Sequence, residues 1–401
     1  MANLNETASA QRIHISFFGL RNAGKSSVVN AVTSQQLSVV SEVKGTTTDP
    51  VKKAMELLPL GPVVIIDTPG IDDEGELGAL RVKKAKEILA KTDVAVLVTD
   101  VTRGMTDTDR ELISSFEDRN IPYIIAFNKC DLACAPETAV ENSVAVSAKT
   151  GEGINDLKLR IASLGKQTEK EKYIIADLTD DGDTVILVIP IDASAPKGRI
   201  ILPQQQVLRE LLDFHRNIIC CQPEELPSVI EGLKNKPRLT VTDSQAFPFV
   251  AKVTPSEIKL TSFSILFARY KGSLEELVRG AKALSELKDG DRVLISEGCT
   301  HHRQCEDIGT VKMPRMISEY SHADLKFDFT SGGDYPDNLS EYKINVHCGG
   351  CMLNEREMQN RIRLSLRNSV PIVNYGVAIA QMNGILKRSL EPFPEILKIL
   401  D

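Results

Sequence analysis

The segment IHISFFGLRNAGKSSVVNAV, residues 13–32, constrains the fold of this chain more than any other feature of its sequence. An apolar run precedes the loop G-L-R-N-A-G-K-S, which fits the pattern G-x-x-x-x-G-K-[ST], and a helical pattern follows. In such a strand–loop–helix unit, backbone N–H groups and the helix N-terminus form a concave site for phosphate groups. We therefore predict an α/β domain with a mostly parallel sheet and a phosphate-binding loop.

This loop supplies the first group of predicted nucleotide contacts. Lys25 would neutralise the β- and γ-phosphates, and Ser26 would bind Mg²⁺. The residues expected to contact the nucleotide here are Asn22, Ala23, Gly24, Lys25, Ser26 and Ser27.

Two further segments complete the expected catalytic group. VVIIDTPG (63–70) is a second buried strand that ends in Asp67, which would hold Mg²⁺ through water, and Gly70 would sense the γ-phosphate. KGTTTDP (44–50) is a polar loop between the two motifs, and we expect Thr47 to close over Mg²⁺ as a switch. The predicted catalytic residues are thus Lys25, Thr47, Asp67 and Gly70.

The segment IIAFNKCD (124–131) indicates which base is bound. A carboxylate only accepts hydrogen bonds, so Asp131 would pair with the ring N–H and exocyclic amine of guanine and would repel adenine. Asn128 and Lys129 would support that loop. VSAK (146–149) would add Ser147, Ala148 and Lys149, with a backbone donor for the guanine oxygen. The order of the four motifs predicts a GTPase that binds GTP and GDP.

Two details refine the expected mechanism. Ile71 follows DTPG, so the water-orienting Gln of Ras-like enzymes is absent at that position. With Asn22 in it, the phosphate loop resembles that of the potassium-activated GTPases of the TrmE/Era class, which implies K⁺-stimulated hydrolysis. The alternative is that Asn22 only caps the loop.

Length and charge limit the number of domains and the classes of function that this chain can have. A chain of 401 residues is too long for one core and predicts two or three domains. Its formal charge of −7 argues against general nucleic-acid binding. We see no signal peptide and no apolar run of membrane-spanning length, so we expect a cytoplasmic protein without a membrane partner.

The patterning divides the chain into three predicted domains. Residues 1–168 form the GTPase domain, and a charged linker follows. Residues 173–270 alternate strand and helix and form a small α/β domain with edge strands that could pair with a second copy. Residues 271–401 form a third α/β domain. We predict a homodimer or a larger homo-oligomer.

Cysteine and histidine residues cluster in the last third of the chain. Cys299 and His301 follow one predicted strand, and H-C-G-G-C (347–351) follows another. If these strands are parallel neighbours, both groups lie outside the carboxyl edge of one sheet. Three thiolates with nearby imidazoles suit either structural zinc or an iron–sulfur cluster, and spacing alone favours neither.

The combination of a TrmE-like GTPase, an α/β middle region and a terminal C-x-H…H-C-x-x-C resembles the HydF family of [FeFe]-hydrogenase maturation GTPases. The resemblance covers essentially the whole chain. It implies a [4Fe–4S] cluster in the C-terminal domain and a dimerising middle domain. It also implies a role as scaffold or carrier for a two-iron precursor, with the hydrogenase apo-enzyme and radical-SAM maturases as partners.

The same resemblance implies the metal ligands. Cys299, Cys348 and Cys351 would be the cluster thiolates, and His301 and His347 match the motif histidines. The fourth iron site stays open between His301, His347, Glu306, Cys305 and an external ligand.

Two other functions compete with this interpretation. The first is a TrmE/Era-like GTPase that acts on RNA and has a zinc-binding tail, against which the acidic balance weighs. The second is an oxidoreductase that uses the cluster for electron transfer, and no flavin or nicotinamide fingerprint supports it.

Overall fold

We describe the protein from a computed structural model. It describes residues 12–34, 50–70, 84–85, 87–134, 142–168, 172–191, 200–298, 308–332, 335–336, 338–350 and 353–400. The chain divides into two compact units, residues 1–171 and residues 172–401.

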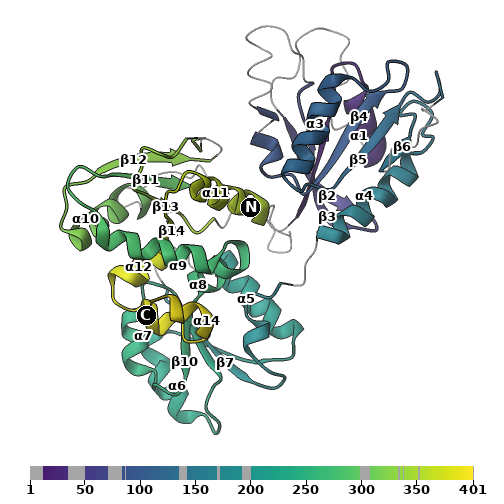
Figure 1. Cartoon of the computed structure of the whole chain (residues 1–401). Helices are drawn as coiled ribbons and strands as arrows, with labels where there is room; N and C mark the ends of the chain where they lie inside the picture. Colours follow the sequence, from purple (N-terminus) through teal and green to yellow (C-terminus); the bar gives the residue numbers. More distant parts are fainter. Residues whose placement is uncertain are drawn as a thin grey trace. The chain divides into compact units, whose positions relative to one another are not determined.

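The first unit is built on a six-stranded sheet with the order β2-β3-β1-β4-β5-β6 (Figure 1). Only the β2–β3 pair is antiparallel, so the sheet is mostly parallel as predicted. The strands are β1 (Ile13–Phe18), β2 (Val51–Leu57), β3 (Gly61–Asp67), β4 (Val94–Asp100), β5 (Tyr123–Asn128) and β6 (Ser143–Ala145). The helices are α1 (Lys25–Thr33), α3 (Asp107–Asp118) and α4 (Ile154–Thr168).

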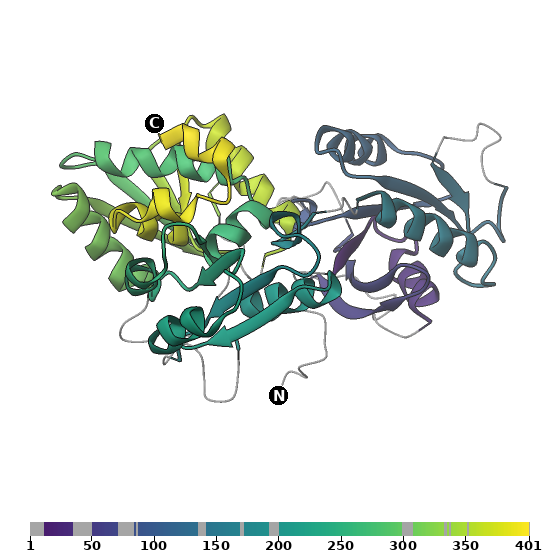
Figure 2. The same ribbon diagram turned by 90° about the horizontal axis from the view of Figure 1, so that it is seen from below.

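Two apolar layers cover this sheet, and its inner strands are therefore buried on both faces. Side chains of α1 and α4 pack on one face, against Phe17 and Val96 among others. Side chains of α3 and of Ala85, Ile88 and Leu89 pack on the opposite face, against Phe18 and Leu97 (Figures 1 and 2). Continuous apolar runs are typical of strands in a parallel sheet covered on both sides.

The second unit contains two four-stranded sheets, and all of their strand pairs are parallel. The first has the order β10-β9-β7-β8, with strands β7 (Thr184–Val188), β8 (Asn217–Cys221), β9 (Leu239–Thr242) and β10 (Lys259–Ser262). The second has the order β12-β11-β13-β14, with strands β11 (Arg292–Glu297), β12 (Lys326–Ser331), β13 (Ile344–His347) and β14 (Ile372–Asn374). The predicted α/β fold class of the middle and C-terminal regions is therefore confirmed.

Helices connect these strands. Around the first sheet they are α5 (Leu202–Asp213), α6 (Leu226–Gly232), α7 (Phe247–Val253) and α8 (Phe263–Lys271). Around the second they are α9 (Leu274–Lys282), α10 (Met313–Ser321), α11 (Glu355–Arg367) and α12 (Tyr375–Met382), followed by α13 (Leu386–Ser389) and α14 (Pro394–Leu397). Short 3₁₀ or π turns occur at Ala176–Leu178, Pro223–Glu225, Ala283–Glu286, Ile308–Lys312 and Lys398–Leu400.

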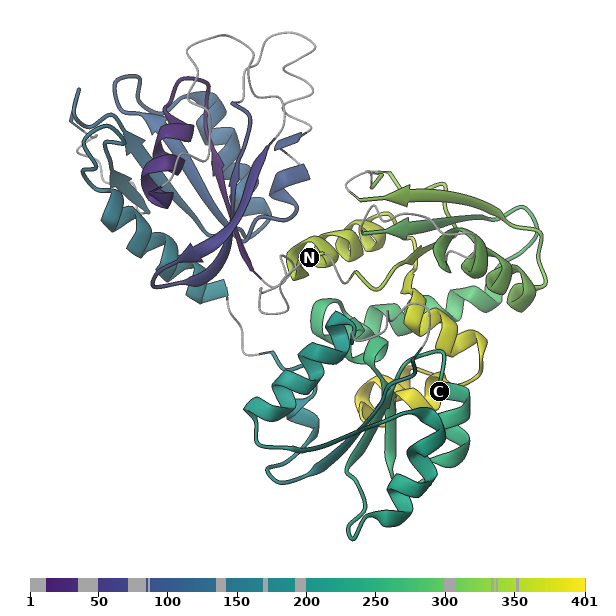
Figure 3. The same ribbon diagram turned by 180° about the vertical axis from the view of Figure 1, so that it is seen from behind.

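One continuous apolar core joins the two sheets of this unit. It contains side chains of β7 and β9, of α8, α9 and α12, and of β11 and β13. The helical layer α8–α9–α12 lies between the two sheets (Figures 1 and 3). The chain also returns to the first sheet at its end, where Thr261 Oγ1 donates a hydrogen bond to the Ser389 carbonyl at 2.8 Å. The predicted boundary near residue 271 thus falls at the end of α8, inside a shared core.

In the part of the chain that the structure describes, no helix combines the length and the apolar character needed to cross a membrane.

Candidate nucleotide site and thiol site

The phosphate loop connects β1 to α1, and its backbone conformation depends on glycine. Gly24 has φ 83°, and a Cβ atom there would come within 2.3 Å of the Asn128 side-chain nitrogen. Asn22 also lies in the left-handed region, with φ 64°. Backbone conformations of this kind are rare outside glycine and gather at functional sites.

Two side chains at the end of β5 hold this loop from the side. Asn128 Nδ2 donates to the Ala23 carbonyl at 2.9 Å, and Lys129 Nζ donates to the Asn22 carbonyl at 3.0 Å. Since these bonds engage two carbonyl oxygens of the loop, they fix how its peptide groups are oriented. A loop held in this way can present its N–H groups to an anion without rearranging.

The predicted Mg²⁺ ligands lie side by side. Ser26 Oγ donates to Asp67 Oδ2 at 2.7 Å, and Lys25 Nζ forms an ion pair with Asp67 Oδ1. Lys25 and Asp67 are only 7% and 6% exposed, so the pair forms inside the protein. Hydroxyl and carboxylate oxygens are the ligands that Mg²⁺ prefers, and these residues therefore fit the ion.

Gly70 lies against the backbone of the phosphate loop. A Cβ atom at this position would come within 3.1 Å of Arg21 Cα. Glycine thus allows the end of the β3 segment to approach the loop closely.

The predicted base-binding residues come together at the ends of β5 and β6. Asp131 is exposed, and its Oδ1 accepts a hydrogen bond from Ser147 Oγ at 2.7 Å. The Ala148 N–H donates to Asn128 Oδ1 at 3.1 Å. One backbone donor of the VSAK segment thus contacts Asn128 in this structure.

Asp100 is a polar residue of this site that sequence reasoning missed. It ends β4 and accepts a hydrogen bond from Lys129 Nζ at 2.6 Å. Burial alone would raise the pKa of Asp100, but hydrogen bonds from Lys129 and Thr102 outweigh it, and the net pKa lies below the usual value. The signal was available, because a buried strand ending in Asp is the pattern that singled out Asp67.

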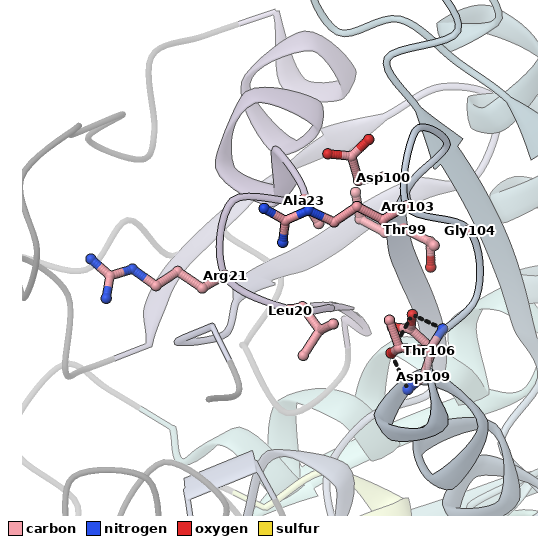
Figure 4. Close-up of a pocket in the computed structure, with 10 residues that line it drawn as sticks. Leu20, Arg21, Ala23, Thr99, Asp100, Arg103, Gly104, Thr106 and Asp109 are labelled. Atoms are coloured by element: carbon pink, nitrogen blue, oxygen red, sulfur yellow. Dashed lines mark hydrogen bonds between the residues drawn. The ribbon is translucent and has the colours of Figure 1, made fainter. Parts of the chain in front are cut away.

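A cavity of about 10 Å³ lies between the phosphate loop and the segment that follows β4 (Figure 4). Leu20 and Ala23 line one wall, and Thr106 and Asp109 line another. Thr106 and Asp109 form a reciprocal capping box at the start of α3, with Thr106 N and Oγ1 donating to Asp109 Oδ2. The volume is at the lower limit for one water molecule, so this cavity does not hold the nucleotide.

Several predicted residues lie outside the described part of the chain. These are Thr47 of the expected switch and Cys299, His301, Cys305, Glu306 and Cys351 of the expected metal site. Their roles stay predictions.

Cys348 is the predicted cluster ligand that the structure describes, and its sulfur is held by backbone donors. Cys348 Sγ accepts from the Gly298 N–H at 3.1 Å and from the Gly350 N–H at 3.4 Å. Strands β11 and β13 are parallel neighbours, which meets the condition stated for a shared site at the carboxyl edge of this sheet. At that edge Cys348 meets Gly298, the residue that precedes Cys299 in the sequence.

The turn after Cys348 is shaped for close packing. Gly350 has φ 63°, and a Cβ atom there would come within 3.3 Å of Met358 Sδ. Asn354 then caps α11, and its Oδ1 accepts from the Glu357 N–H at 3.0 Å. A helix N-terminus near a thiol favours the thiolate form.

His347 occupies a different environment from Cys348. The ring is fully buried, its Nδ1 donates to the Cys348 carbonyl at 2.7 Å, and its Nε2 accepts from Arg361 Nη1 at 3.0 Å. Burial and then the Arg361 charge lower the pKa of His347 to about 3. Both ring nitrogens are therefore engaged within the protein, and neither faces a metal in this arrangement.

The described residues of the thiol site fit a metal group that is bound through cysteine thiolates. Backbone N–H groups that donate to a cysteine sulfur stabilise negative charge on it. Within the described ranges, no three His, Cys, Asp or Glu side chains stand close enough to hold a metal ion by themselves.

The fold and the first site define the N-terminal unit as a P-loop GTPase domain, and its family model, described as "50S ribosome-binding GTPase", matches residues 14–129. The models for "Hydrogen maturase F dimerization domain" and "Hydrogen maturase F tetramerization domain" match residues 174–272 and 275–392. Those two models together cover more than half of the chain. This protein belongs to the HydF family of hydrogenase maturation GTPases, which confirms the resemblance, and it carries the family's oligomerisation domains.

Individual relatives match the GTPase domain. The tRNA modification GTPase MnmE of Desulfotalea psychrophila is 35% identical over 162 residues, which cover 38% of this chain and 34% of the relative. MnmE of Methylococcus capsulatus is 36% identical over 159 residues, with 38% and 35% covered. The chain thus spans about a third of the length of these relatives.

Among solved structures, Era of Aquifex aeolicus bound to GDP and AlF₄⁻ is 20% identical and covers 60% of this chain and 97% of Era. Its TM-score of 0.35 is too low to support an argument.

Proposed function

We propose that this protein is a GTP-hydrolysing scaffold that binds a [4Fe–4S] cluster and assembles or delivers the two-iron precursor of the [FeFe]-hydrogenase active site. Membership of the HydF family supports a role in hydrogenase maturation. The observation that carries the cluster site is that Cys348 Sγ accepts hydrogen bonds from two backbone N–H groups. One of these donors is Gly298, the residue that precedes Cys299 in the sequence. The cluster would be held by Cys299, Cys348 and Cys351, with the fourth position open to exchange.

GTP hydrolysis is the reaction proposed for the N-terminal unit. Lys25 would neutralise phosphate charge, while Ser26 and Asp67 would hold Mg²⁺ and Asp131 would select guanine. When bound, Mg²⁺ supplies charge stabilisation on the phosphate oxygens. Hydrolysis would change contacts of the segments at 41–50 and 68–80 with partners, so the GTPase acts as a timer for cluster transfer.

We further propose that K⁺ stimulates hydrolysis, since Asn22 stands in the phosphate loop and no Gln follows DTPG. Hydrolysis rates measured in KCl and in NaCl at equal ionic strength test this point. Equal rates in the two salts would contradict it.

The proposed partners are a hydrogenase apo-enzyme, radical-SAM maturases and further copies of this chain, in the cytoplasm.

The cluster proposal is tested by the iron, sulfide and zinc content of anaerobically purified protein, with an EPR spectrum after reduction. We expect about four iron and four sulfide per chain, with the signal of a reduced [4Fe–4S] cluster. Cys348→Ala should lose both iron and signal. Cys220→Ala is the matched control because Cys220 is an exposed thiol on β8, and it should lose neither.

One tightly held zinc ion per chain, with no iron after anaerobic reconstitution, would contradict the proposal. That outcome would favour an RNA-associated GTPase with a structural zinc site.

A further inference from the structure

A cavity of about 230 Å³ lies at the amino edge of the first sheet in the second unit. Leu239 and Lys259, the first residues of the neighbouring parallel strands β9 and β10, line it. Asp180, which comes shortly before β7, and Pro392 and Pro394 near the end of the chain line it as well. Pockets for drug-sized ligands usually enclose about 300–1,000 Å³, so this volume suits a smaller metabolite.

The walls of this cavity are held in place by the residues behind them. Thr179, another lining residue, accepts two hydrogen bonds from Arg216, from Nε to Oγ1 at 3.0 Å and from Nη2 to the carbonyl at 2.8 Å. The two lining prolines flank Phe393, and the Arg269 guanidinium carbon lies 5.0 Å from the centre of that ring. A cavity with fixed walls binds a ligand with little cost of rearrangement.

Two charged groups of the lining are available to a ligand. Lys259 and Asp180 are both exposed, and neither side chain has an ion-pair partner among the residues that the structure describes. Arg238 also lines the cavity, but it is shared with Asp183, whose Oδ2 lies 3.7 Å from Arg238 Nε.

The other acidic residue of the lining is already neutralised. The two carboxylate oxygens of Asp177 accept hydrogen bonds from Nη1 and Nη2 of Arg269, each at 2.7 Å. A bidentate pair of this kind is among the stronger ionic contacts in proteins. The unpaired charges of the cavity are therefore one ammonium and one carboxylate.

This pair of charges selects one class of small ligand. A simple anion would be attracted by Lys259 and repelled by Asp180, and a simple cation would meet the reverse. A zwitterion can present its carboxylate to Lys259 and its ammonium to Asp180, so both charges are complemented. Leu178, Leu239 and the prolines add apolar surface that a small apolar side chain would cover.

We propose that this cavity binds a free amino acid with a small apolar side chain. The inference goes beyond the proposed function and does not depend on it, because no lining residue belongs to the nucleotide site or the thiol site.

The test is calorimetric titration of the full-length chain with L-alanine, L-valine and two analogues of valine. Isovalerate keeps the carboxylate and lacks the ammonium, and isobutylamine keeps the ammonium and lacks the carboxylate. Inorganic phosphate is the probe for a simple anion site. We expect L-alanine or L-valine to bind, and both analogues and phosphate to bind at least about 10-fold more weakly, because each leaves one charge of the cavity without a partner.

Variants of the two charged residues test the same point from the side of the protein. Lys259→Met and Asp180→Asn should each weaken binding of the amino acid by about 10-fold. The matched losses of one charge are Lys252→Met at the end of α7 and Glu224→Gln in the turn after β8, since both residues are exposed and neither lines the cavity. These two variants should bind as wild type does.

Three results would overturn the inference: no binding of either amino acid at millimolar concentration, equal binding of isovalerate or phosphate, or equal weakening by the control variants. The comparison of ligands on wild type decides the point even if a variant does not fold. Each of these results would leave the proposed function intact.

Discussion

Two sheets of this protein, one mostly parallel and one parallel throughout, gather polar groups at the carboxyl ends of their parallel strands. The hydrogen bonds at these two edges run in opposite directions. At the end of β5, side chains donate to backbone carbonyls of the phosphate loop, from Asn128 to Ala23 and from Lys129 to Asn22. At the ends of β11 and β13, backbone N–H groups of Gly298 and Gly350 donate to the sulfur of Cys348.

The direction of these hydrogen bonds differs with the source of the negative charge expected at each sheet edge. In the first sheet the side chains hold the loop by two of its carbonyls, so the loop keeps one shape when it meets an anion that arrives from solution. In the second sheet the N–H groups donate to a sulfur atom of the protein itself, where they would stabilise a negative charge. The carboxyl edge thus presents a backbone loop in one unit and a cysteine sulfur in the other.

The largest expected effect concerns the buried cation next to the thiol edge. Arg361 is 3% exposed, pairs with Glu357 at 3.1 Å and donates to His347. Arg361→Met should lower the local free energy of unfolding around α11 by about 3–5 kcal/mol, because it leaves Glu357 and His347 without their partner. Hydrogen exchange of the α11 and β13 amides measures this change.

A surface pair on α10 is the control for that variant. The side chains of Arg315 and Glu319 form an i,i+4 pair and are 77% and 62% exposed. Arg315→Met should change stability by no more than about 0.5 kcal/mol. Equal effects of the two substitutions would show that the His347 environment is not a structural element of the thiol edge.

A smaller effect is expected at the nucleotide edge, on specificity. Asp131→Asn replaces one acceptor oxygen with a donor, so the variant should bind GTP about 100-fold more weakly and should gain affinity for xanthosine triphosphate. Titration with fluorescent GTP and xanthosine triphosphate analogues measures both affinities.

The matched control is Asp118→Asn, which makes the same change at an exposed carboxylate at the end of α3. It should leave both affinities unchanged. An Asp131→Asn variant that still prefers GTP as wild type does would place base recognition on other residues.

The smallest effects compare the helix caps at the two edges. Thr106 caps α3 beside the phosphate loop, and Asn354 caps α11 beside the thiol turn. Replacing either residue with Ala should cost about 1 kcal/mol of stability. Asn354→Ala should also speed iron loss, whereas Thr106→Ala should not. Chelator kinetics measure both rates, and faster iron loss from Thr106→Ala than from Asn354→Ala would contradict this expectation.

The segments of the nucleotide site could be named from sequence because each of its motifs is contiguous. The hydrogen bonds between the motifs could not be predicted, because Asn128 and Ala23 are 105 residues apart and neither segment indicates its partner. Asp100 escaped for a different reason: it has no motif, and only its place at the end of a buried strand marks it.

The thiol site was predictable in outline, namely that two parallel strands bring residues 298 and 348 together. Its buried cation was not, because Arg361 lies on a helix, where a charged residue normally faces solvent. The segment FSILFARY, residues 263–270, lies in α8, where the Ser262 side chain caps the helix by accepting a hydrogen bond from the Ile265 N–H.

The apolar core that joins the two sheets of the second unit has a consequence for how that unit can be divided. Side chains of α8, such as Leu266, and of α9, such as Val278, belong to one core with strands of both sheets. A gene fragment that begins at residue 271 would therefore expose apolar surface that the preceding residues cover, and it would aggregate. Residues 172–401 are the smallest piece of this region that should be expressed on its own.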